Sequence, residues 1–424
     1  MKRCFAAYFI GLLLFFNLPV TVMAQDTLSL NDLIDEALEK SPYVKVFQMN
    51  KDALWERPSQ VKAWDDPKIT LGVTNLPVDD FDFNKQDMTQ KSVSVMQAIP
   101  FPGISSLKEK AAIEEAKGAE KELANIEIKT VNAVKKIYYD LYFICQSIEI
   151  TDENIDLMEK FVELTQTKYE VGNGLQEDIL KSQVELYKLQ EKLINLKQKE
   201  VSMRADMLRL LNRNDGDKLP GVPKLEKTLD TVSLEDLKTT TFDENPLLQQ
   251  LNHLVAQKET EYLLAKKSYF PKFSITAAYG QRDDRDSIDR HRPDFMSFLF
   301  GVDIPVWFKS KQNKKVAESQ LRILQAKAQL QSVKNDISYK LNDLLARIKK
   351  DEELVSLYEK QIIPEAAQSL DSNMSAYQVG RLDFLNLLNS QMTLLNYEIK
   401  FHKVLSDLEK DFADLEYVVG KRIF

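Results

Sequence analysis

Hydrophobic residues recur every three or four positions over very long stretches of the chain, which predicts helices that are unusually long. From Gly103 to about Glu170 there is no proline and only one internal glycine, Gly118. At 1.5 Å per residue, a helix of this length extends about 100 Å. A single globular core cannot cover such a helix, so the pattern predicts packing against other long helices.

A second helix is predicted after the Gly172-Asn173-Gly174 turn, because glycine permits the left-handed backbone found at helix ends. Its apolar positions step by three and four residues, and the pattern recurs 208 residues later. This seam predicts left-handed, antiparallel coiled-coil pairs. Its polar members either set the register or face water. The first seam comprises Ile179, Ser182, Leu186, Leu189, Leu193, Leu196, Glu200, Met203, Met207 and Leu210.

Four shorter segments instead alternate apolar and polar residues with a period of two, which predicts strands. Two alternatives stay open for them: a small half-buried sheet in a soluble domain, or membrane-spanning strands. Charged loops separate the members of each pair, at residues 79–82 and 283–286. The apolar sets are Ile69, Leu71 and Val73; Val93, Val95 and Ile99; Phe273, Ile275, Ala277 and Tyr279; and Met296, Phe298, Phe300, Val302 and Ile304.

The chain contains an internal duplication. Ser29-Leu30-Asn31-Asp32-Leu33 returns as Ser233-Leu234-Glu235-Asp236-Leu237, an offset of 204 residues, and the segment 169–172 returns as 377–380, an offset of 208. Seven such matches occur in the same order with a slowly rising offset. Repeats of this kind predict two halves with the same plan.

The predicted boundaries follow from this plan. The first half covers residues 25–214, with strands at about 67–76 and 91–100 and helices at about 103–171 and 175–212. A linker over 215–232 contains Pro220-Gly221-Val222-Pro223, which breaks any helix. The second half covers 233–424, with strands at about 271–281 and 294–305 and helices at about 311–378 and 383–419.

Residues 1–24 have the features of a secretory signal peptide. Met1-Lys2-Arg3 precedes an apolar run from Phe5 to Phe16, and Val22-Met23-Ala24 forms a small-x-small cleavage pattern before Gln25. The rival interpretation, a membrane anchor, is disfavoured because Asn17 and Pro19 interrupt the run below spanning length.

Composition excludes several function classes. After residue 24 nothing approaches 18 consecutive apolar residues, which argues against transport by inner-membrane helices. The chain has 57 Lys and Arg against 65 Asp and Glu, and no basic stripe interleaved with aromatics, so nucleic acid is not an expected partner.

No catalytic, cofactor or metal constellation is found, so the chain is not expected to be an enzyme or to need a cofactor. Cys145 is the only cysteine outside the predicted leader, so neither a disulfide nor a thiolate zinc site can be built. His253, His291 and His402 are far apart in sequence and are favoured as packing or solvated residues.

The mature chain resembles the TolC-like outer-membrane efflux proteins. The motifs that carry this resemblance are the duplicated Leu-Ser-Leu-Asn-Asp-Leu at 28–33, the strand approach Asp66–Gly72, the strand exits Gln97–Gly103 and Gly301–Val306, and the tip segment Tyr377–Gln391. The Asp-Pro and Gln-x-Ile-Pro-x-Pro-Gly combination of the first half is closest to the heavy-metal (Czc/Cus-type) branch.

The resemblance implies a mainly α fold with a small β part. Four strands from each chain of a homotrimer would close a transmembrane barrel, with Pro67, Pro100, Pro271 and Pro305 at the strand–helix junctions. The helices would form a second, coiled-coil barrel across the periplasm. The implied function is the exit duct of an efflux system with a periplasmic adaptor and an inner-membrane pump of the RND type. The alternative is a secreted periplasmic coiled-coil scaffold or adaptor.

The resemblance also marks the helix tips around Gly172 and Gly380 as the periplasmic aperture. Family members often place acidic residues nine and twelve positions after the tip tyrosine. Here these positions are Asn386 and Asn389 after Tyr377, and Asp178 and Lys181 after Tyr169, so an all-acidic ring is not expected. Two interpretations of Asp178, Arg381 and Asp383 stay open: polar links that hold the coils closed, or ordinary exposed helix-start residues.

Overall fold

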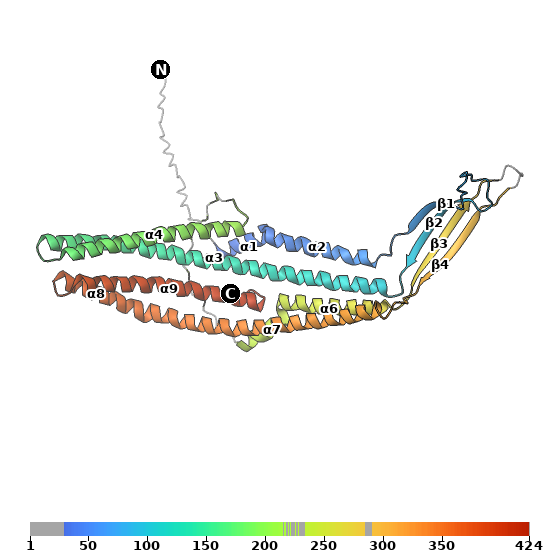
Figure 1. Ribbon diagram of the computed structural model, residues 1–424. Helices are drawn as coiled ribbons and strands as arrows, with labels where there is room; N and C mark the ends of the chain where they lie inside the picture. Colours follow the sequence, from blue (N-terminus) through green and yellow to red (C-terminus); the bar gives the residue numbers. More distant parts are fainter. Residues whose placement is uncertain are drawn as a thin grey trace, which may run out of the picture.

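The computed structural model describes residues 29–214, 234–284 and 291–423, together with isolated positions between 215 and 233. The chain forms a long rod of helices with a four-stranded sheet at one end and two helix turns at the other (Figure 1). The expected signal peptide and most of the expected linker lie outside the described residues. Across the described ranges, no helix combines the length and apolar character needed to cross a bilayer.

The two halves contain the same elements in the same order. The first half comprises α1 (Leu30–Lys40), α2 (Pro42–Lys62), β1 (Lys68–Thr74), β2 (Gln90–Ile99), α3 (Ile104–Glu170) and α4 (Gln176–Leu210). The second half comprises α5 (Leu234–Glu244), α6 (Pro246–Lys267), β3 (Lys272–Gln281), β4 (Phe295–Asp303), α7 (Gln312–Leu357), η2 (Tyr358–Ile362), α8 (Ile363–Gln378) and α9 (Phe384–Val419).

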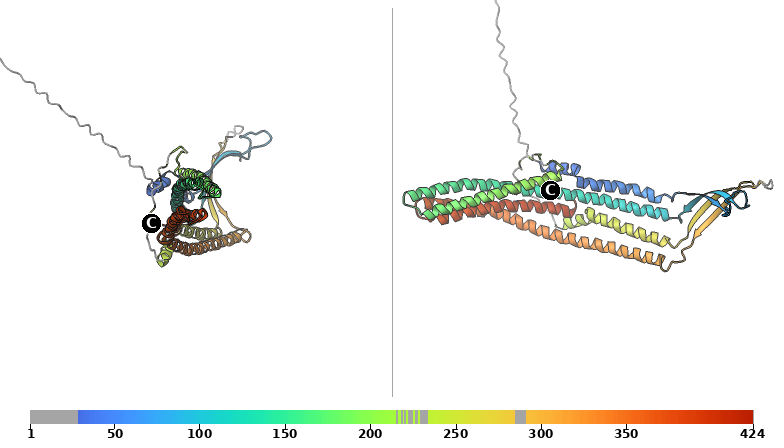
Figure 2. Two further views of the ribbon diagram at one scale, coloured as in Figure 1. Left: turned by 90° about the vertical axis from the view of Figure 1, so that its left-hand side faces the viewer. Right: turned by 45° about the horizontal axis from the view of Figure 1, so that its top comes forward.

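The strands continue into helices without changing their order. The sheet order is β1-β2-β3-β4, and all neighbours are antiparallel. The helices connected to these strands, α2, α3, α6 and α7, pack side by side in the same order. The right-hand view of Figure 2 shows this arrangement. We call this single layer of strands and helices the wall.

Each strand and the helices that continue it form one column of the wall. Toward the helix tips, the wall keeps the same number of columns. The amide nitrogen of Asn245, directly before α6, donates to the carbonyl oxygen of Val418 at 2.8 Å, near the end of α9. Helix α9 therefore extends the column of α6 toward the tips. Helix α3 runs the whole length and packs against both α4 and α9. The rod is held together along this shared helix.

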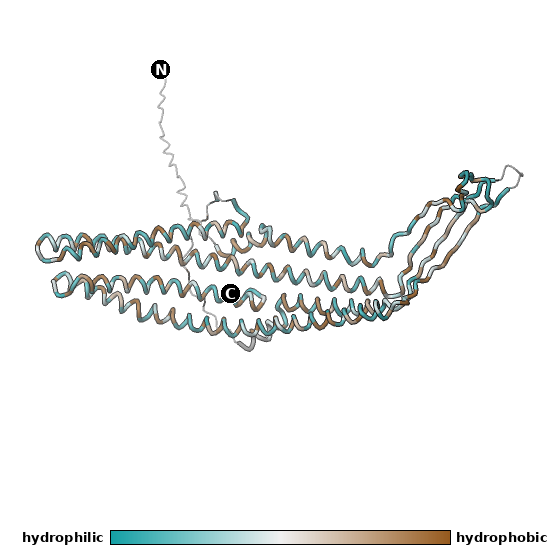
Figure 3. Tube along the Cα trace, in the orientation of Figure 1, coloured by the Kyte–Doolittle hydropathy of each residue, from teal (hydrophilic) through white to brown (hydrophobic). Residues whose placement is uncertain are grey.

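The strand register places every predicted apolar set on one face. Ile69 pairs with Val95, Val95 with Ala277, and Ala277 with Phe298. Thr70, Ser94, Ala278 and Ser297 are paired in the same way on the opposite face. The apolar face is exposed, and the loops beyond the strands are mainly hydrophilic (Figure 3). β1 and β4 each leave one edge unpaired within the chain.

The helix predicted over about 311–378 is interrupted, which corrects the expectation of one continuous helix. It consists of α7 and α8 joined by the π-helical turn η2, in which the N–H of Ile363 donates to the carbonyl of Tyr358, five residues earlier. The cause is Pro364, which has no N–H and whose ring would clash with the carbonyl of residue 360 in a regular helix. A π turn is a common way to absorb such a break.

Three of the strands, β1, β3 and β4, are shorter than predicted, whereas β2 has the predicted length. β1 begins directly after Pro67 and ends at Thr74, because Asn75 adopts a left-handed backbone with φ of 56°. β4 covers Phe295–Asp303 rather than 294–305, so Ile304 lies beyond the sheet. Proline cannot donate to a strand ladder, which explains why β1 and β3 begin directly after one and β2 ends directly before one.

Candidate functional site

The two helix turns at the end of the rod have the same backbone geometry. Gly172 and Gly380 have φ of 75° and 73°, a left-handed conformation that favours glycine. The N–H of Gly172 donates to the carbonyl of Tyr169 at 2.9 Å, and that of Gly380 donates to Tyr377 at 3.0 Å. These bonds are 208 residues apart, so the duplication extends to individual hydrogen bonds.

The tip tyrosines differ in their surroundings. The side chain of Tyr169 is on the surface, with the residue 47% exposed, whereas Tyr377 is 4% exposed and packs against Phe384, with ring centroids 5.7 Å apart. Burial raises the pKa of Tyr377 to about 12, and the carboxylate of Asp178 adds to the rise. Asp178 in α4 therefore lies close enough to Tyr377 in α8 for the two repeats to interact electrostatically.

Lys168 joins the two tips within one chain. Its ammonium group donates to the carbonyl of Tyr377 at 2.5 Å and lies 4.4 Å from the centre of the tyrosine ring. A lysine at the carbonyl end of α8 adds a second donor to the carbonyl of Tyr377 and complements the negative end of the helix dipole. The sequence analysis missed this residue. Its only signal is a basic residue in the last turn of α3.

A buried apolar cluster supports the tips from within. Phe161 of α3 contacts Phe384 of α9 edge to face, with centroids 6.3 Å apart. Met158 and Leu387 are fully buried in the same cluster. This cluster couples the first repeat to the second directly behind the turns.

The predicted tip residues of the first repeat lie in the first turns of α4. Asp178 is half-buried, and its N–H donates to the carbonyl of Leu175 at 3.1 Å. Lys181 forms an ion pair with Glu177 at 2.5 Å, one helical turn away. The charge of Lys181 is therefore neutralised by the carboxylate of Glu177 on the same helix.

The predicted tip residues of the second repeat are on the surface. Arg381, Asp383, Asn386 and Asn389 are all exposed. Asp383 precedes α9, and its carbonyl accepts from the N–H of Asn386 at 3.1 Å, which matches the Leu175–Asp178 bond of the other turn. Among the described residues of a single chain, Asp178, Arg381 and Asp383 form no ion pair with one another.

The four predicted junction prolines flank the strands. Pro67 and Pro271 directly precede β1 and β3, Pro100 directly follows β2, and Pro305 lies two residues after β4. Phe101 and Phe270 stack across the two repeats next to these junctions, with centroids 4.2 Å apart. Each column therefore changes from strand to helix at the same level.

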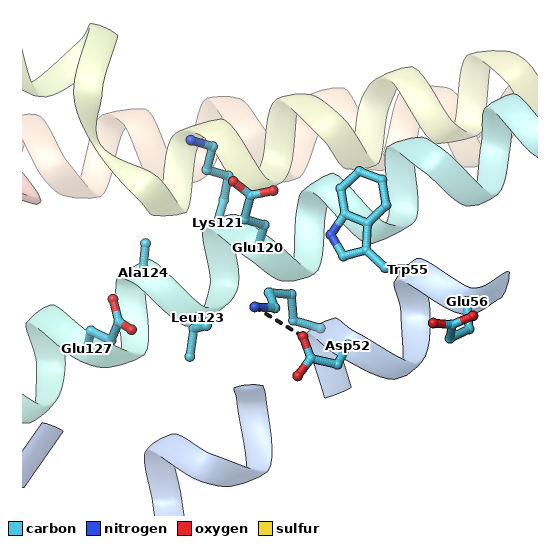
Figure 4. Close-up of a pocket in the computed structure, with 9 residues that line it drawn as sticks. Asp52, Trp55, Glu56, Glu120, Lys121, Leu123, Ala124 and Glu127 are labelled. Atoms are coloured by element: carbon cyan, nitrogen blue, oxygen red, sulfur yellow. Dashed lines mark ion pairs between the residues drawn. The ribbon is translucent and has the colours of Figure 1, made fainter. Parts of the chain in front are cut away.

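Two hollows along the rod are lined mainly by charged groups. A groove of about 600 Å³ between α2 and α3 is flanked by Trp55 and Asp52 from α2 and by Glu120 and Glu127 from α3 (Figure 4). Burial raises the pKa of Glu127, although the charge of Lys51 opposes the rise. The second hollow is of about 370 Å³ and lies between α3, α7 and α9. We call it the charged cavity.

Ion pairs fill the charged cavity. Lys410 lies 2.6 Å from Asp140, and Lys136 lies 2.9 Å from Asp414, so both pairs join α3 of the first repeat to α9 of the second. Asp411 is paired with Arg347 at 3.1 Å. Asp411 lies 208 residues after Met203 and so takes the same place in the repeated seam, where it is buried rather than facing water.

The described residues contain no cluster of three or more His, Cys, Asp and Glu with metal-site geometry. The histidines occupy separate places. His253 contacts Glu114 at 2.8 Å, His402 contacts the hydroxyl of Tyr142 at 2.9 Å, and His291 lies in an exposed loop near Asp284. None of the three is near another.

This fold defines a class of outer-membrane channel proteins. The chain belongs to the outer membrane efflux protein family, whose model matches residues 33–213 and again residues 240–421. The double match agrees with the internal duplication, and the expected TolC-like resemblance is confirmed. Membership places the chain in the outer membrane, with its helices extending into the periplasm.

Individual relatives are distant in sequence but close in fold. The outer membrane efflux protein BepC of Brucella suis is 21% identical over 319 residues, a match that spans 70% of this chain and 65% of BepC. VceC of Vibrio cholerae has a TM-score of 0.77 at 16% identity, covering 92% of this chain and 96% of VceC. CusC has a TM-score of 0.78 at 13% identity, covering 93% and 92% of the two chains.

Proposed function

We propose that this protein is the outer-membrane exit duct of a tripartite efflux system and conducts substrate passively, without chemistry of its own. The observation that carries the proposal is the wall, whose sheet has one exposed apolar face and two unpaired edges and continues column by column into helices. In lipid, each unpaired backbone group costs several kcal/mol, so such a sheet requires closure by further copies. Members of this family form trimers.

The edges of the helical rod support the same assembly. Leu180, Tyr187, Ile194 and Val201 recur along α4 at intervals of seven residues and are all exposed. This stripe is separate from the seam through which α4 packs on α3. A second heptad stripe on one helix calls for a second helical partner. The opposite edge helix, α7, also exposes apolar residues in the part nearer the tips, including Tyr339 and Leu357. A head-to-tail ring brings these two edges together.

We assign the tips to the periplasmic mouth of the duct, where a periplasmic adaptor would connect it to an inner-membrane pump of the RND type. Family members work with such partners. In this assembly the pump selects the cargo. Arg381 and Asp383 are exposed and form no ion pair with any other described residue, so they are available for contacts between copies.

A secreted coiled-coil scaffold is the alternative, and the sheet argues against it. Phe298 is 73% exposed, midway along the edge strand β4, on an apolar face formed by all four strands. A contiguous apolar surface of this kind in water is an aggregation hazard.

The mass of the detergent-solubilised mature protein, combined with conductance in planar bilayers, tests the proposal. We expect three copies per particle and discrete channel openings. A stable monomer in detergent-free buffer would contradict the duct.

A further inference from the structure

A cavity of about 250 Å³ lies at the foot of β2 and β3, where the strands pass into helices. Apolar side chains form one part of its lining, among them Trp64, Ile99 and Phe273. Three lysines from different elements form another part: Lys108 of α3, Lys272 of β3 and Lys315 of α7. We call this cavity the junction pocket.

Within the described residues, the lysines of the junction pocket form no ion pairs. Lys108, Lys272 and Lys315 are exposed, and none forms an ion pair with a carboxylate in the described part of the chain. Neighbouring lysines are engaged: Lys62 pairs with Glu109 at 3.0 Å, and Lys267 lies over the ring of Phe101. Asp65 is the single acidic residue in the lining, so the pocket has an excess of positive charge.

The apolar part of the pocket continues the face of the sheet that meets lipid in the proposed duct. Ile99 and Phe273 pair directly across β2 and β3 and are the last apolar-face residues of these strands before the helices. Trp64 and Trp307 are both exposed at this level of the chain. Tryptophan favours the boundary between hydrocarbon and water, so the pocket lies at the membrane boundary on the periplasmic side.

We propose that the junction pocket binds an anionic phospholipid of the periplasmic leaflet. Its phosphate lies between Lys108 and Lys315, and its acyl chain follows Ile99 and Phe273 along the apolar face of the sheet. Lysine side chains suit this arrangement because their stems cover apolar surface while the ammonium groups reach the headgroups. The inference rests on the proposed membrane duct and adds to it a lipid-specific contact.

Trp64 provides a local reporter for the experiment. The full mature protein, solubilised in detergent and carrying Trp55→Phe and Trp307→Phe, retains Trp64 as its single tryptophan. Titration with phosphatidylglycerol or phosphatidylcholine bearing a quencher on the acyl chain then measures binding beside the pocket. We expect phosphatidylglycerol to quench at lower concentration, with a preference that weakens as salt is raised.

Lys108→Gln combined with Lys315→Gln should raise the phosphatidylglycerol midpoint about tenfold, which corresponds to about 1.4 kcal/mol, because lysines near a lipid surface attract anionic headgroups. The matched control is Lys311→Gln with Lys314→Gln, which removes the same charge from exposed lysines of the same segment outside the pocket. The control should leave the midpoint unchanged.

Four outcomes would overturn the inference. Equal quenching by the two lipids, or equal midpoints in the two double variants, would show that the headgroup is not recognised. Displacement of phosphatidylglycerol by millimolar inorganic phosphate would mark a site for small soluble anions. A changed channel conductance with unchanged quenching would place the lysines on the lumen. Particle mass in the same samples separates the two proposals: an intact trimer without lipid preference refutes only the lipid site, and a monomer refutes the duct.

Discussion

Lys168 and Tyr377 connect the two helix tips of one chain through a hydrogen bond of 2.5 Å and a cation–π contact of 4.4 Å. The lysine belongs to the first repeat and the tyrosine to the second, so separating the tips has to break both contacts. The contact lies in a partly solvated position and complements the dipole of α8. It is therefore a polar link between the two repeats at the proposed mouth.

Lys168→Met should favour the open mouth. The change keeps most of the side-chain volume but removes the charged donor, at a cost to the closed state of about 1 kcal/mol. This shifts the ratio of closed to open states about fivefold. Single-channel recordings in planar bilayers should show more frequent openings, and Lys168→Arg should restore most of the closed population. Identical recordings for Met and Arg would remove the contact from the gate.

Asp178→Ala and Arg381→Ser test links between copies. If these charges meet across the assembled mouth, each variant should lose about 0.5–2 kcal/mol of ion pairing and show larger or more frequent openings. Asp283→Ala is the control, because Asp283 pairs with Lys91 at 2.9 Å near the outer loops. Unchanged conductance in both tip variants would leave these residues as ordinary exposed helix-start residues.

The lipid-facing surface of the sheet can be tested at two adjacent positions. Phe298→Arg should destabilise the protein by about 2–4 kcal/mol if the residue lies near the bilayer midplane. Ser297→Arg, at the same depth on the opposite face, should mainly alter conductance. Urea unfolding in lipid vesicles measures the first effect and bilayer recording the second. Equal destabilisation at both positions would contradict the assignment of the faces.

Ile194→Asp should prevent assembly without unfolding the chain. Ile194 is 69% exposed on the second stripe of α4, so the charge costs little in the monomer but would be buried between copies. Particle mass in detergent should fall to that of one chain, while circular dichroism should report an unchanged helix content. Lys199→Gln makes the same change in charge on another side of α4 and should leave the trimer intact. A trimeric Ile194→Asp protein would show that the stripe is not an interface.

The charged cavity predicts a pH dependence of stability with opposite signs at two neighbouring aspartates. Burial raises the pKa of Asp411 to about 6, with Arg347 opposing the rise. Between about pH 4 and about pH 6, the folded state therefore holds a proton on Asp411 that the unfolded state has released. This proton stabilises the fold, and the stabilisation is lost as pH rises from about 4 to above 6. The free energy of unfolding of Asp411→Asn, relative to that of the parent protein, should therefore rise by about 2 kcal/mol between pH 4.5 and pH 8.

Asp407 is the control for this effect. Burial opposes its ionisation, but hydrogen bonds from Lys403 and Lys410 outweigh burial and lower its pKa. It therefore stabilises the fold above the unfolded pKa of 3.8, and Asp407→Asn should be destabilising at pH 5 and above. Thermal unfolding across this pH range measures both. Parallel pH profiles for the two variants would contradict the assigned directions.

Much of the fold follows from local patterns in the sequence. The period of two predicts that Ile69, Val95 and Phe298 lie on one face, and the strand register confirms this. A register shift of one residue would move a strand's apolar residues to the opposite face. The repeat offset likewise placed Gly172 and Gly380 in equivalent turns, which need glycine for the same backbone reason.

The missed features depend on long-range or competing signals. The helical pattern around Pro364 is strong enough to predict one continuous helix, but the proline causes a π turn. Lys168 contacts a residue 209 positions away, which no local pattern predicts. The α4 stripe at Leu180, Tyr187, Ile194 and Val201 was present in the sequence but lay beside a stronger seam, so only the structure separates the two.

The preserved order of strands and helices has a geometric consequence for the junctions. Adjacent strands lie about 4.8 Å apart, so four of them span about 14 Å between the outer axes, whereas four helices at 8–10 Å span about 24–30 Å. The same four columns must therefore nearly double their width where they leave the sheet. If each strand continued directly into its helix, a single residue would have to accommodate this change in spacing. The short segments around Pro67, Pro100, Pro271 and Pro305 distribute it, which makes their lengths a determinant of how wide the duct opens below the membrane.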